Sequence, residues 1–173
     1  MSCCRYTFPT IVEAFYGGQS AGTALADVLF GDVNPSGILP YTLVPSSYER
    51  LVNMTDMRLR ASPEDDFPGR TYRFYNGSVL WPFGFGLSYT TFELAWLQQL
   101  PLAAVAPSDF LNPAFIQQQL GVSVSNSGTR HGKKVVQLFV TTPSGYNSPL
   151  KSLTGMVKVD LQAGKDTTVR MTR

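Results

Sequence analysis

The sequence predicts an α+β fold in which one α/β unit precedes an antiparallel β-sandwich. Apolar residues between Ala21 and Leu29 recur at helical spacing, directly after a glycine turn. From Phe115 onward, apolar residues alternate with polar ones, which is typical of half-buried strands. Fifteen Gly and twelve Pro among 173 residues indicate many turns. Together these observations favour β-structure and loops over a helical bundle.

The first part of the chain contains one strand, a turn, a helix and an extended segment. Pro9–Tyr16 has the composition of a short buried strand, and Gly17–Ser20 is a turn. We expect the Ser20 side chain to cap the following helix by accepting a backbone hydrogen bond. Gly31 suits the left-handed position that ends such a helix, and Ile38–Leu43 is extended. One such unit is too small to form an independent sheet.

The second part of the chain contains a series of short strands with turns between them. Their spacing predicts a β-sandwich. Residues 45–70 are polar and predict a surface loop, residues 98–114 a linker or insertion, and residues 143–149 another loop. The predicted strands are Thr91–Leu97, 120–125, Val135–Val140, Val157–Leu161 and Thr167–Met171.

Charge and hydropathy exclude several classes of partner. The net charge of +2 is too small to indicate nucleic-acid binding, and the densest basic pair, Lys133-Lys134, lies on a predicted strand. No apolar run approaches the ~20 residues of a membrane helix, so no membrane partner is expected. Met1–Thr10 lacks the apolar core of a signal peptide.

The two cysteines predict neither a disulfide framework nor a metal site. Cys3 and Cys4 are adjacent, and neighbouring cysteines close a disulfide only with strain. Two thiols without a second Cys or His pair nearby are a poor metal site. We interpret them as free thiols, with pairing to cysteines of a missing region as the alternative. No cofactor motif is present either, because the glycine turn lacks a nucleotide-binding pattern.

The candidate site is a dense block of aromatic residues and glycines. It comprises Gly69–Tyr75 and Trp81–Thr90. Arg70 and Arg73 lie among its aromatic rings, where they could stack on a ring face or pair with buried acids. Arg70 and Arg73 are interpreted as residues that hold a domain interface together, with contact to a sugar as the alternative. Trp81 is a further candidate for either role.

Other polar residues predict no catalytic arrangement. His131 is the single histidine and is expected in an exposed loop. Asp65 and Asp66 are adjacent and predict a solvated surface loop rather than a carboxylate pair. Asn53 and Asn76 begin Asn-x-Ser/Thr patterns, so both are possible glycosylation sites if the chain is secreted.

Several segments resemble glycoside hydrolase family 3, the β-glucosidase and β-xylosidase family. Tyr16–Gly31 is similar to its glycine-turn-plus-helix motif, although Gly18 stands where the family often has proline-glycine spacing. Asn34–Pro40 resembles the strand that follows. The aromatic block resembles the signature near the end of the family's second catalytic-core domain. Within it, Gly69–Tyr75 is more similar to the β-xylosidases than to the β-glucosidases of the family.

The last part of the chain resembles the fibronectin type III-like domain of the same family. The similar segments are Val122–Val140 and Leu161–Asp166. The resemblance implies two domains. Residues 1–90 would be the tail of the second, α/β sandwich domain, and residues 91–173 an incomplete fibronectin type III-like β-sandwich that needs one or two more strands.

The resemblance also implies a reaction that this chain would not perform alone. Family members are retaining enzymes, in which two carboxylates about 5 Å apart act as nucleophile and as acid/base. Both are expected upstream of the matching segments, so we assign no catalytic residue. Glu13 lies downstream of the position expected for the acid/base, so it is not assigned that role. The complete enzyme would act on a β-linked oligosaccharide or plant cell-wall glycan, and the family is usually extracellular.

Three hypotheses of function follow. The chain is the C-terminal part of a β-xylosidase or β-glucosidase, inactive alone and able to associate with a chain that carries the missing barrel domain. Alternatively, it is a non-catalytic module that binds polysaccharide or supports a partner chain. The third hypothesis is a truncated product without a stable fold, because an unpaired sheet edge is prone to aggregate.

Overall fold

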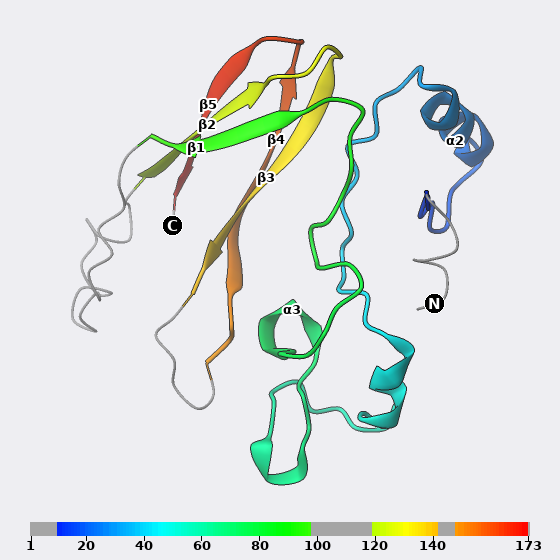
Figure 1. The fold of residues 1–173 in the computed structure, drawn as a ribbon, viewed down its shortest axis with the longest axis vertical. Coiled ribbons are helices and arrows are strands. Elements are labelled where there is room, and N and C mark those ends of the chain that lie inside the picture. Colours follow the sequence, from blue (N-terminus) through cyan, green and yellow to red (C-terminus); the bar gives the residue numbers. More distant parts are fainter. Residues whose placement is uncertain (1–9, 98–118, 142–147, 173) are drawn as a thin grey trace. The chain divides into compact units, whose positions relative to one another are not determined.

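A computed structural model describes residues 10–97, 119–141 and 148–172 of the chain. The chain divides into two compact units, Met1–Gly86 and Leu87–Arg173. The first unit contains helix α2 (Ala21–Phe30), two short 3₁₀ helices (Ser46–Arg50 and Pro63–Asp65) and the one-turn helix α3 (Thr71–Phe74). The second contains the strands (Figure 1).

Helix α2 forms where the apolar spacing predicts it. Gly31 ends it in the left-handed conformation, with φ of 86°, and its N–H donates to the Val28 carbonyl at 3.1 Å. A residue with a Cβ is strained at this φ, so the predicted role of Gly31 is confirmed. Ser20 occupies the N-cap position, but its side chain makes no capping hydrogen bond, and that part of the prediction is wrong.

The predicted buried strand before the glycine turn is wrong. Residues 10–16 form no strand and are exposed, with Tyr16 fully so at 105% relative accessibility. Phe15 has a φ of 50°, in the left-handed region that aromatic residues rarely adopt, which interrupts the extended backbone. The residues have strand composition, but a strand also needs hydrogen-bonding neighbours, and none lies beside them among the described residues.

The predicted extended segment 38–43 runs beside residues 80–85. The Leu39 N–H donates to the Phe85 carbonyl at 2.8 Å, and the Leu43 N–H to the Trp81 carbonyl at 2.9 Å. Only the Leu43–Trp81 pair has the geometry of a β-bridge. This pairing joins the second part of the aromatic block, which begins at Trp81, to a segment much earlier in the chain.

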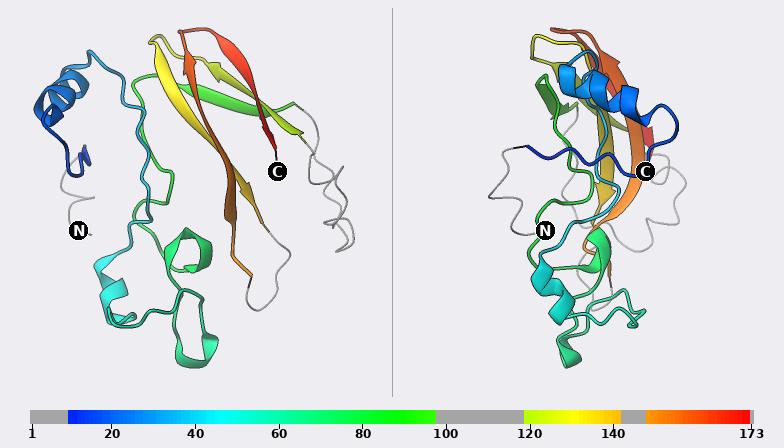
Figure 2. Two further views of the ribbon diagram at one scale, coloured as in Figure 1. Left: turned by 180° about the vertical axis from the view of Figure 1, so that it is seen from behind. Right: turned by 90° about the vertical axis from the view of Figure 1, so that its right-hand side faces the viewer.

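The second unit contains two antiparallel sheets (Figure 2). One has the order β1-β2-β5, and the other pairs β3 with β4. A register shift between Leu138 and Phe139 interrupts the β3–β4 ladder. All five predicted strands are present, but β3 begins at Gly132 instead of Val135 and β4 at Ser152 instead of Val157. Their bounds are β1 (Phe92–Trp96), β2 (Gln119–Asn126), β3 (Gly132–Val140), β4 (Ser152–Leu161) and β5 (Asp166–Thr172).

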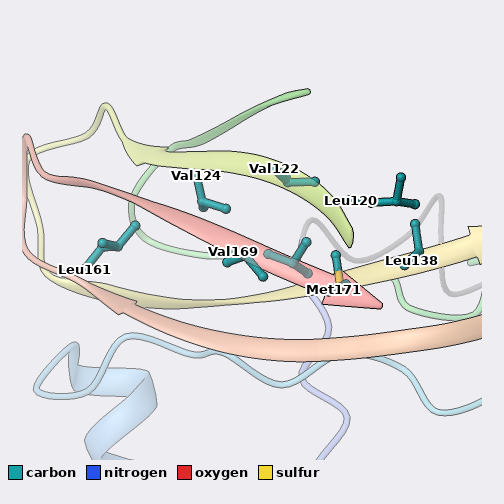
Figure 3. Packing of buried hydrophobic residues seen from close by; sticks show 8 residues of the cluster. Leu120, Val122, Val124, Leu138, Leu161, Val169 and Met171 are labelled. Carbon is teal, nitrogen blue, oxygen red and sulfur yellow. The ribbon is translucent and has the colours of Figure 1, made fainter. Parts of the chain in front are cut away.

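The core of the second unit lies between its two sheets (Figure 3). Val124 of β2 has no exposed surface, and alternate residues along β2 share its face. This period of two is the pattern that the sequence shows, because successive strand side chains point to opposite faces. The buried cluster consists of Leu120, Val122, Val124, Val136, Leu138, Leu161, Val169 and Met171.

The fold class is therefore confirmed as mixed α and β, with few helices and antiparallel sheets that do not close into a barrel. No helix within the described ranges is both long and apolar enough to cross a membrane. The same ranges contain no cluster of His, Cys, Asp and Glu suited to a metal ion. Cys3, Cys4, the linker at 98–114 and most of the loop at 143–149 lie outside the described residues.

Candidate functional site

The candidate site lies in the first unit and is organised around Arg70. The Arg70 backbone is extended, and α3 begins with the next residue. Its Nη2 donates to the carbonyls of Asn53 at 2.9 Å and Asp56 at 2.7 Å, while its N–H donates to the Leu59 carbonyl at 2.8 Å. Arg70 therefore fixes the loop at 53–59 against the start of α3. Its Nε is buried and has no hydrogen-bond partner among the described residues.

Gly69 allows this close approach. It has a φ of 82°, and a Cβ there would lie 2.5 Å from the Phe74 carbonyl oxygen, well inside van der Waals contact. The Tyr48 hydroxyl donates to the Gly69 carbonyl at 3.1 Å. The Tyr48 ring meets Tyr75 edge-on, with centroids 5.1 Å apart. Burial raises the pKa of the Tyr48 hydroxyl, and the charge of Arg70 partly opposes that rise.

A second arginine in the loop, Arg58, holds two carboxylates. It contacts Asp56 at 2.7 Å and Asp65 at 2.5 Å, and its guanidinium lies 4.6 Å from the centre of the Phe67 ring. Hydrogen bonds from Arg58 lower the pKa of Asp56 to about 2. The pKa of Asp65 is also lowered, first by a hydrogen bond from Ser62 and then by Arg58.

This carboxylate pair has the wrong electrostatics for a glycosidase acid. A general acid that works near neutral pH needs a raised pKa, so that it carries a proton before the reaction. Asp56 and Asp65 instead have lowered pKa values, because Arg58 holds Asp56 while Ser62 and then Arg58 hold Asp65. The arrangement is a salt-bridge network that shapes the loop. Sequence reasoning missed Arg58 and Asp56, although their i, i+2 spacing of opposite charges was a visible signal.

The other predicted site residues have separate surroundings. Arg73 is exposed and its guanidinium lies 5.3 Å from the centre of the Phe74 ring. Trp81 pairs with Leu43 through the backbone, and Tyr72 stacks on Phe83 with centroids 4.3 Å apart. The structure thus brings Arg70 and Asn53 together, whereas Arg73 lies beside Phe74 and Trp81 beside Leu43. Interface and sugar-contact roles for Arg70, Arg73 and Trp81 stay predictions.

Both predicted glycosylation sites are exposed. The Asn53 Oδ1 accepts hydrogen bonds of 3.0 Å from the N–H and the hydroxyl of Thr55, which is the third residue of its pattern. The Asn76 backbone N–H donates to the Pro68 carbonyl at 3.4 Å. Both residues are exposed, and modification at either site stays a prediction.

The remaining candidates carry no catalytic geometry. Glu13 is exposed, and its carboxylate accepts a hydrogen bond of 3.3 Å from the Phe15 N–H. His131 is exposed, as predicted, and its Nε2 contacts the Asp160 carboxylate across the β3–β4 ladder. That contact is the main reason that the pKa of Asp160 is lowered. Asp66 is exposed and has a φ of 54° in the turn after the second 3₁₀ helix.

Comparisons with known proteins identify the class to which this fold and sequence belong. Residues 5–89 match the sequence model of the glycosyl hydrolase family 3 C-terminal domain. Residues 134–172 match that of the fibronectin type III-like domain. The chain belongs to glycoside hydrolase family 3, and the predicted resemblance is confirmed.

Among curated relatives, the chain is 41% identical to β-xylosidase/α-L-arabinofuranosidase 1 of Medicago sativa subsp. varia, over 90% of this chain and 22% of the relative. It is 37% identical to a xylan 1,4-β-xylosidase of Xylanibacter ruminicola, over 93% of this chain and 16% of the relative. The chain thus spans about a fifth of the length of the relatives it matches.

Solved structures show the same relationship. A GH3 exo-β-xylosidase in complex with a xylobiose aziridine activity-based probe superimposes with a TM-score of 0.70 at 30% identity, covering 88% of this chain and 21% of that one. A β-glucosidase from Erythrobacter marinus gives a TM-score of 0.68 at 35% identity, covering 97% and 20%. Both units therefore have counterparts within larger glycosidase chains.

Proposed function

We propose that this chain forms the C-terminal part of a retaining β-glycosidase that releases xylosyl units from β-linked plant cell-wall glycans. The observation that carries the proposal is the continuous match to β-xylosidases over about nine tenths of the chain. Relatives named as probable β-glucosidases also match, so the experiment below compares a xyloside with a glucoside as substrate. The family's retaining chemistry uses a carboxylate nucleophile and a second carboxylate as acid/base.

Both catalytic carboxylates are proposed to lie in the part of the enzyme that this chain does not span. The salt-bridged state of Asp56 and Asp65 supports this proposal for the acid/base, because a low pKa is the opposite of what proton donation requires. The role of the chain is then structural: its first unit completes the α/β domain, and its second contributes the fibronectin type III-like domain. An extracellular location is part of the proposal and agrees with the exposed patterns at Asn53 and Asn76.

The experiment uses a chimeric enzyme. The stretch of the Medicago enzyme that matches this chain is replaced by all 173 residues. We expect the chimera to hydrolyse an aryl β-D-xyloside faster than an aryl β-D-glucoside, and the isolated chain to hydrolyse neither. Turnover by the isolated chain, lost when one of its own carboxylates is mutated, would contradict the proposal. So would a folded chimera without activity on either substrate.

A further inference from the structure

The sequence contains a single Asn-Gly pair, Asn76-Gly77, and it lies just after the end of α3. Both residues are exposed. An asparagine before a glycine is chemically labile, because the backbone nitrogen of the glycine can attack the side-chain carbonyl carbon and close a succinimide ring. Glycine favours this attack, since it has no Cβ that would hinder the nitrogen or restrict the backbone. The pair is therefore a candidate for spontaneous loss of the side-chain amide.

The two reacting groups of this pair make no hydrogen bond to any other described residue. The nucleophile is the Gly77 backbone nitrogen, and the group that it attacks is the Asn76 carboxamide; neither has such a partner. The backbone of Asn76 is held separately, because its N–H donates to the Pro68 carbonyl at 3.4 Å. The attack therefore requires no hydrogen bond of either reacting group to a described residue to break first.

The other described asparagines differ from Asn76 in these respects. The Asn53 Oδ1 accepts two hydrogen bonds from Thr55, which hold its carboxamide in place. Asn126 is only 1% exposed, and both its oxygen and its nitrogen are hydrogen-bonded. Asn34 precedes Pro35, whose ring nitrogen carries no hydrogen and cannot act as the nucleophile. These three asparagines are the natural internal controls for Asn76.

Packing in the fold requires a glycine at position 77. A Cβ there would lie 2.4 Å from the Tyr75 hydroxyl oxygen and 2.6 Å from the ring carbon that carries it. The same hydroxyl donates to the Ser78 carbonyl at 3.0 Å, so the Tyr75 side chain closes the turn across Gly77. The Tyr75 ring also meets Tyr48 edge-on. A bulkier residue that slowed the attack would displace Tyr75, so the fold itself maintains the labile pair.

We infer that Asn76 loses its side-chain amide spontaneously and becomes a mixture of aspartate and isoaspartate, which loosens the turn after α3. The Gly77 nitrogen bonds to the Asn76 Cγ, the bond from Cγ to Nδ2 breaks, and Nδ2 leaves as ammonia with the proton of the Gly77 nitrogen. Water then opens the succinimide: cleavage of the bond to Cγ gives aspartate, and cleavage of the bond to the backbone carbonyl carbon gives isoaspartate. No oxidant or reductant takes part, and the inference does not depend on the proposed function.

The two products have different effects on the turn. Isoaspartate adds a methylene carbon to the backbone inside the turn that the Tyr75–Ser78 hydrogen bond closes, so this bond should open. The Tyr75 N–H, which donates to the Thr71 carbonyl at 2.9 Å at the end of α3, should then be less protected. Aspartate keeps the length of the backbone. A glycan at Asn76 would be attached to the nitrogen that leaves, so glycosylation and amide loss exclude one another there.

The test follows the full chain, made without glycans in the bacterial cytosol, during incubation at mildly alkaline pH. Peptide mapping by mass spectrometry should show conversion of Asn76 at least ~10-fold faster than conversion of Asn53 or Asn126. Ammonia should be released in step, and protein isoaspartyl methyltransferase should label the peptide that contains position 76. If Asn76 kept its amide for as long as Asn126, the inference would be overturned.

Two variants separate the chemistry from its structural effect. Asn76→Gln keeps the carboxamide but needs a larger ring, so its amide should persist through the incubation. Amide exchange at Tyr75 should become ~10-fold faster in the isoaspartyl form of the unaltered chain, but not in incubated Asn76→Gln or in freshly prepared Asn76→Asp. Ammonia loss from Asn76→Gln at the original rate would overturn the route through Gly77. Unchanged exchange at Tyr75 in the isoaspartyl form would overturn the loosening of the turn.

Discussion

The Thr90 hydroxyl donates a hydrogen bond of 2.7 Å to the Oδ1 of Asn126, which joins the segment before β1 to the end of β2. The same oxygen accepts from the Gly128 N–H at 3.2 Å. The Asn126 Nδ2 donates to the carbonyls of Arg130 at 2.8 Å and Leu161 at 3.1 Å. Only 1% of Asn126 is exposed, so this buried carboxamide has partners for both its acceptor and its donor group.

Asn126 should be among the most sensitive polar positions of the second unit. Asn126→Ala leaves Thr90, Gly128 and two carbonyls without this partner, and we expect a loss of about 1–3 kcal/mol of unfolding free energy. Asn126→Asp should cost more, because it places a carboxylate oxygen against the Arg130 and Leu161 carbonyls. Amide exchange along β2 measures the change locally.

Ser127→Ala is the matched control for Asn126. The Ser127 side chain is exposed and its hydroxyl contact with the Thr91 carbonyl is long, at 3.5 Å. Its removal should change stability by less than ~0.5 kcal/mol. If Asn126→Ala were as mild as this control, the carboxamide would not be a main support of the unit.

Gly69 is the backbone position on which the Arg70 loop depends. Gly69→Ala combines a positive φ with a clash against the Phe74 carbonyl, so we expect the first unit to lose about 1–3 kcal/mol of stability. Gly37→Ala is the control, because nothing lies within 4 Å of its added Cβ. Urea unfolding of the two variants, followed by Trp81 fluorescence in a Trp96→Phe background, compares them. An unchanged midpoint for Gly69→Ala would show that the loop relaxes around the methyl group.

Local patterns predicted the strands of the second unit and, in the first unit, helix α2 and its end at Gly31, but not the structure of residues 10–16. The alternation along β2 can be recognised without knowing the neighbouring strands, because every second residue is apolar and faces the core. The segment 10–16 has an equally clear strand composition, but strand formation depends on a partner that the described residues do not supply. Ser20 similarly occupies the right position for a cap without making the predicted bond.

The candidate site was predictable only in part, because its contacts are not local. The sequence singled out Arg70, yet its partners are carbonyls 14 and 17 residues earlier in the chain, which no side-chain pattern reveals. In the sequence, Asn126 looks like an ordinary residue of a turn. Its burial results from the folded structure and is not visible in the sequence. The contacts of Arg70 and the burial of Asn126 can be recognised only in the folded structure, where segments distant in the sequence meet.

Glycosylation gives a prediction that depends on the extracellular proposal. If the chain is secreted from a eukaryotic host, we expect glycans at the exposed Asn53 and Asn76. Asn53→Gln and Asn76→Gln should each remove one glycan, and intact mass before and after enzymatic deglycosylation counts them. Unmodified protein from a secreting host would contradict the prediction at the site concerned, and cytosolic expression in bacteria provides the unmodified reference.

The Asp56–Arg58 pair predicts a pH dependence with a definite sign. Asp56 has a folded-state pKa of about 2, below the ordinary value of 3.8, because Arg58 donates hydrogen bonds to its carboxylate. A carboxyl group whose pKa is depressed by folding stabilises the fold above its ordinary pKa. That contribution is lost as the pH falls through the folded value, here between about 4 and 2.

Arg58→Gln removes the side-chain hydrogen bonds and the charge that cause most of this shift, while the hydrogen bond of 2.9 Å from the backbone N–H of residue 58 to Asp56 stays. In the variant, the pKa of Asp56 should rise toward 3.8, measured by NMR from the side-chain carboxyl carbon during an acid titration. Asp160 is the internal control: its pKa is lowered chiefly by His131 and should not change. An Asp56 pKa that stays near 2 in Arg58→Gln would mean that Arg70 or the loop backbone, rather than Arg58, keeps the carboxylate ionised.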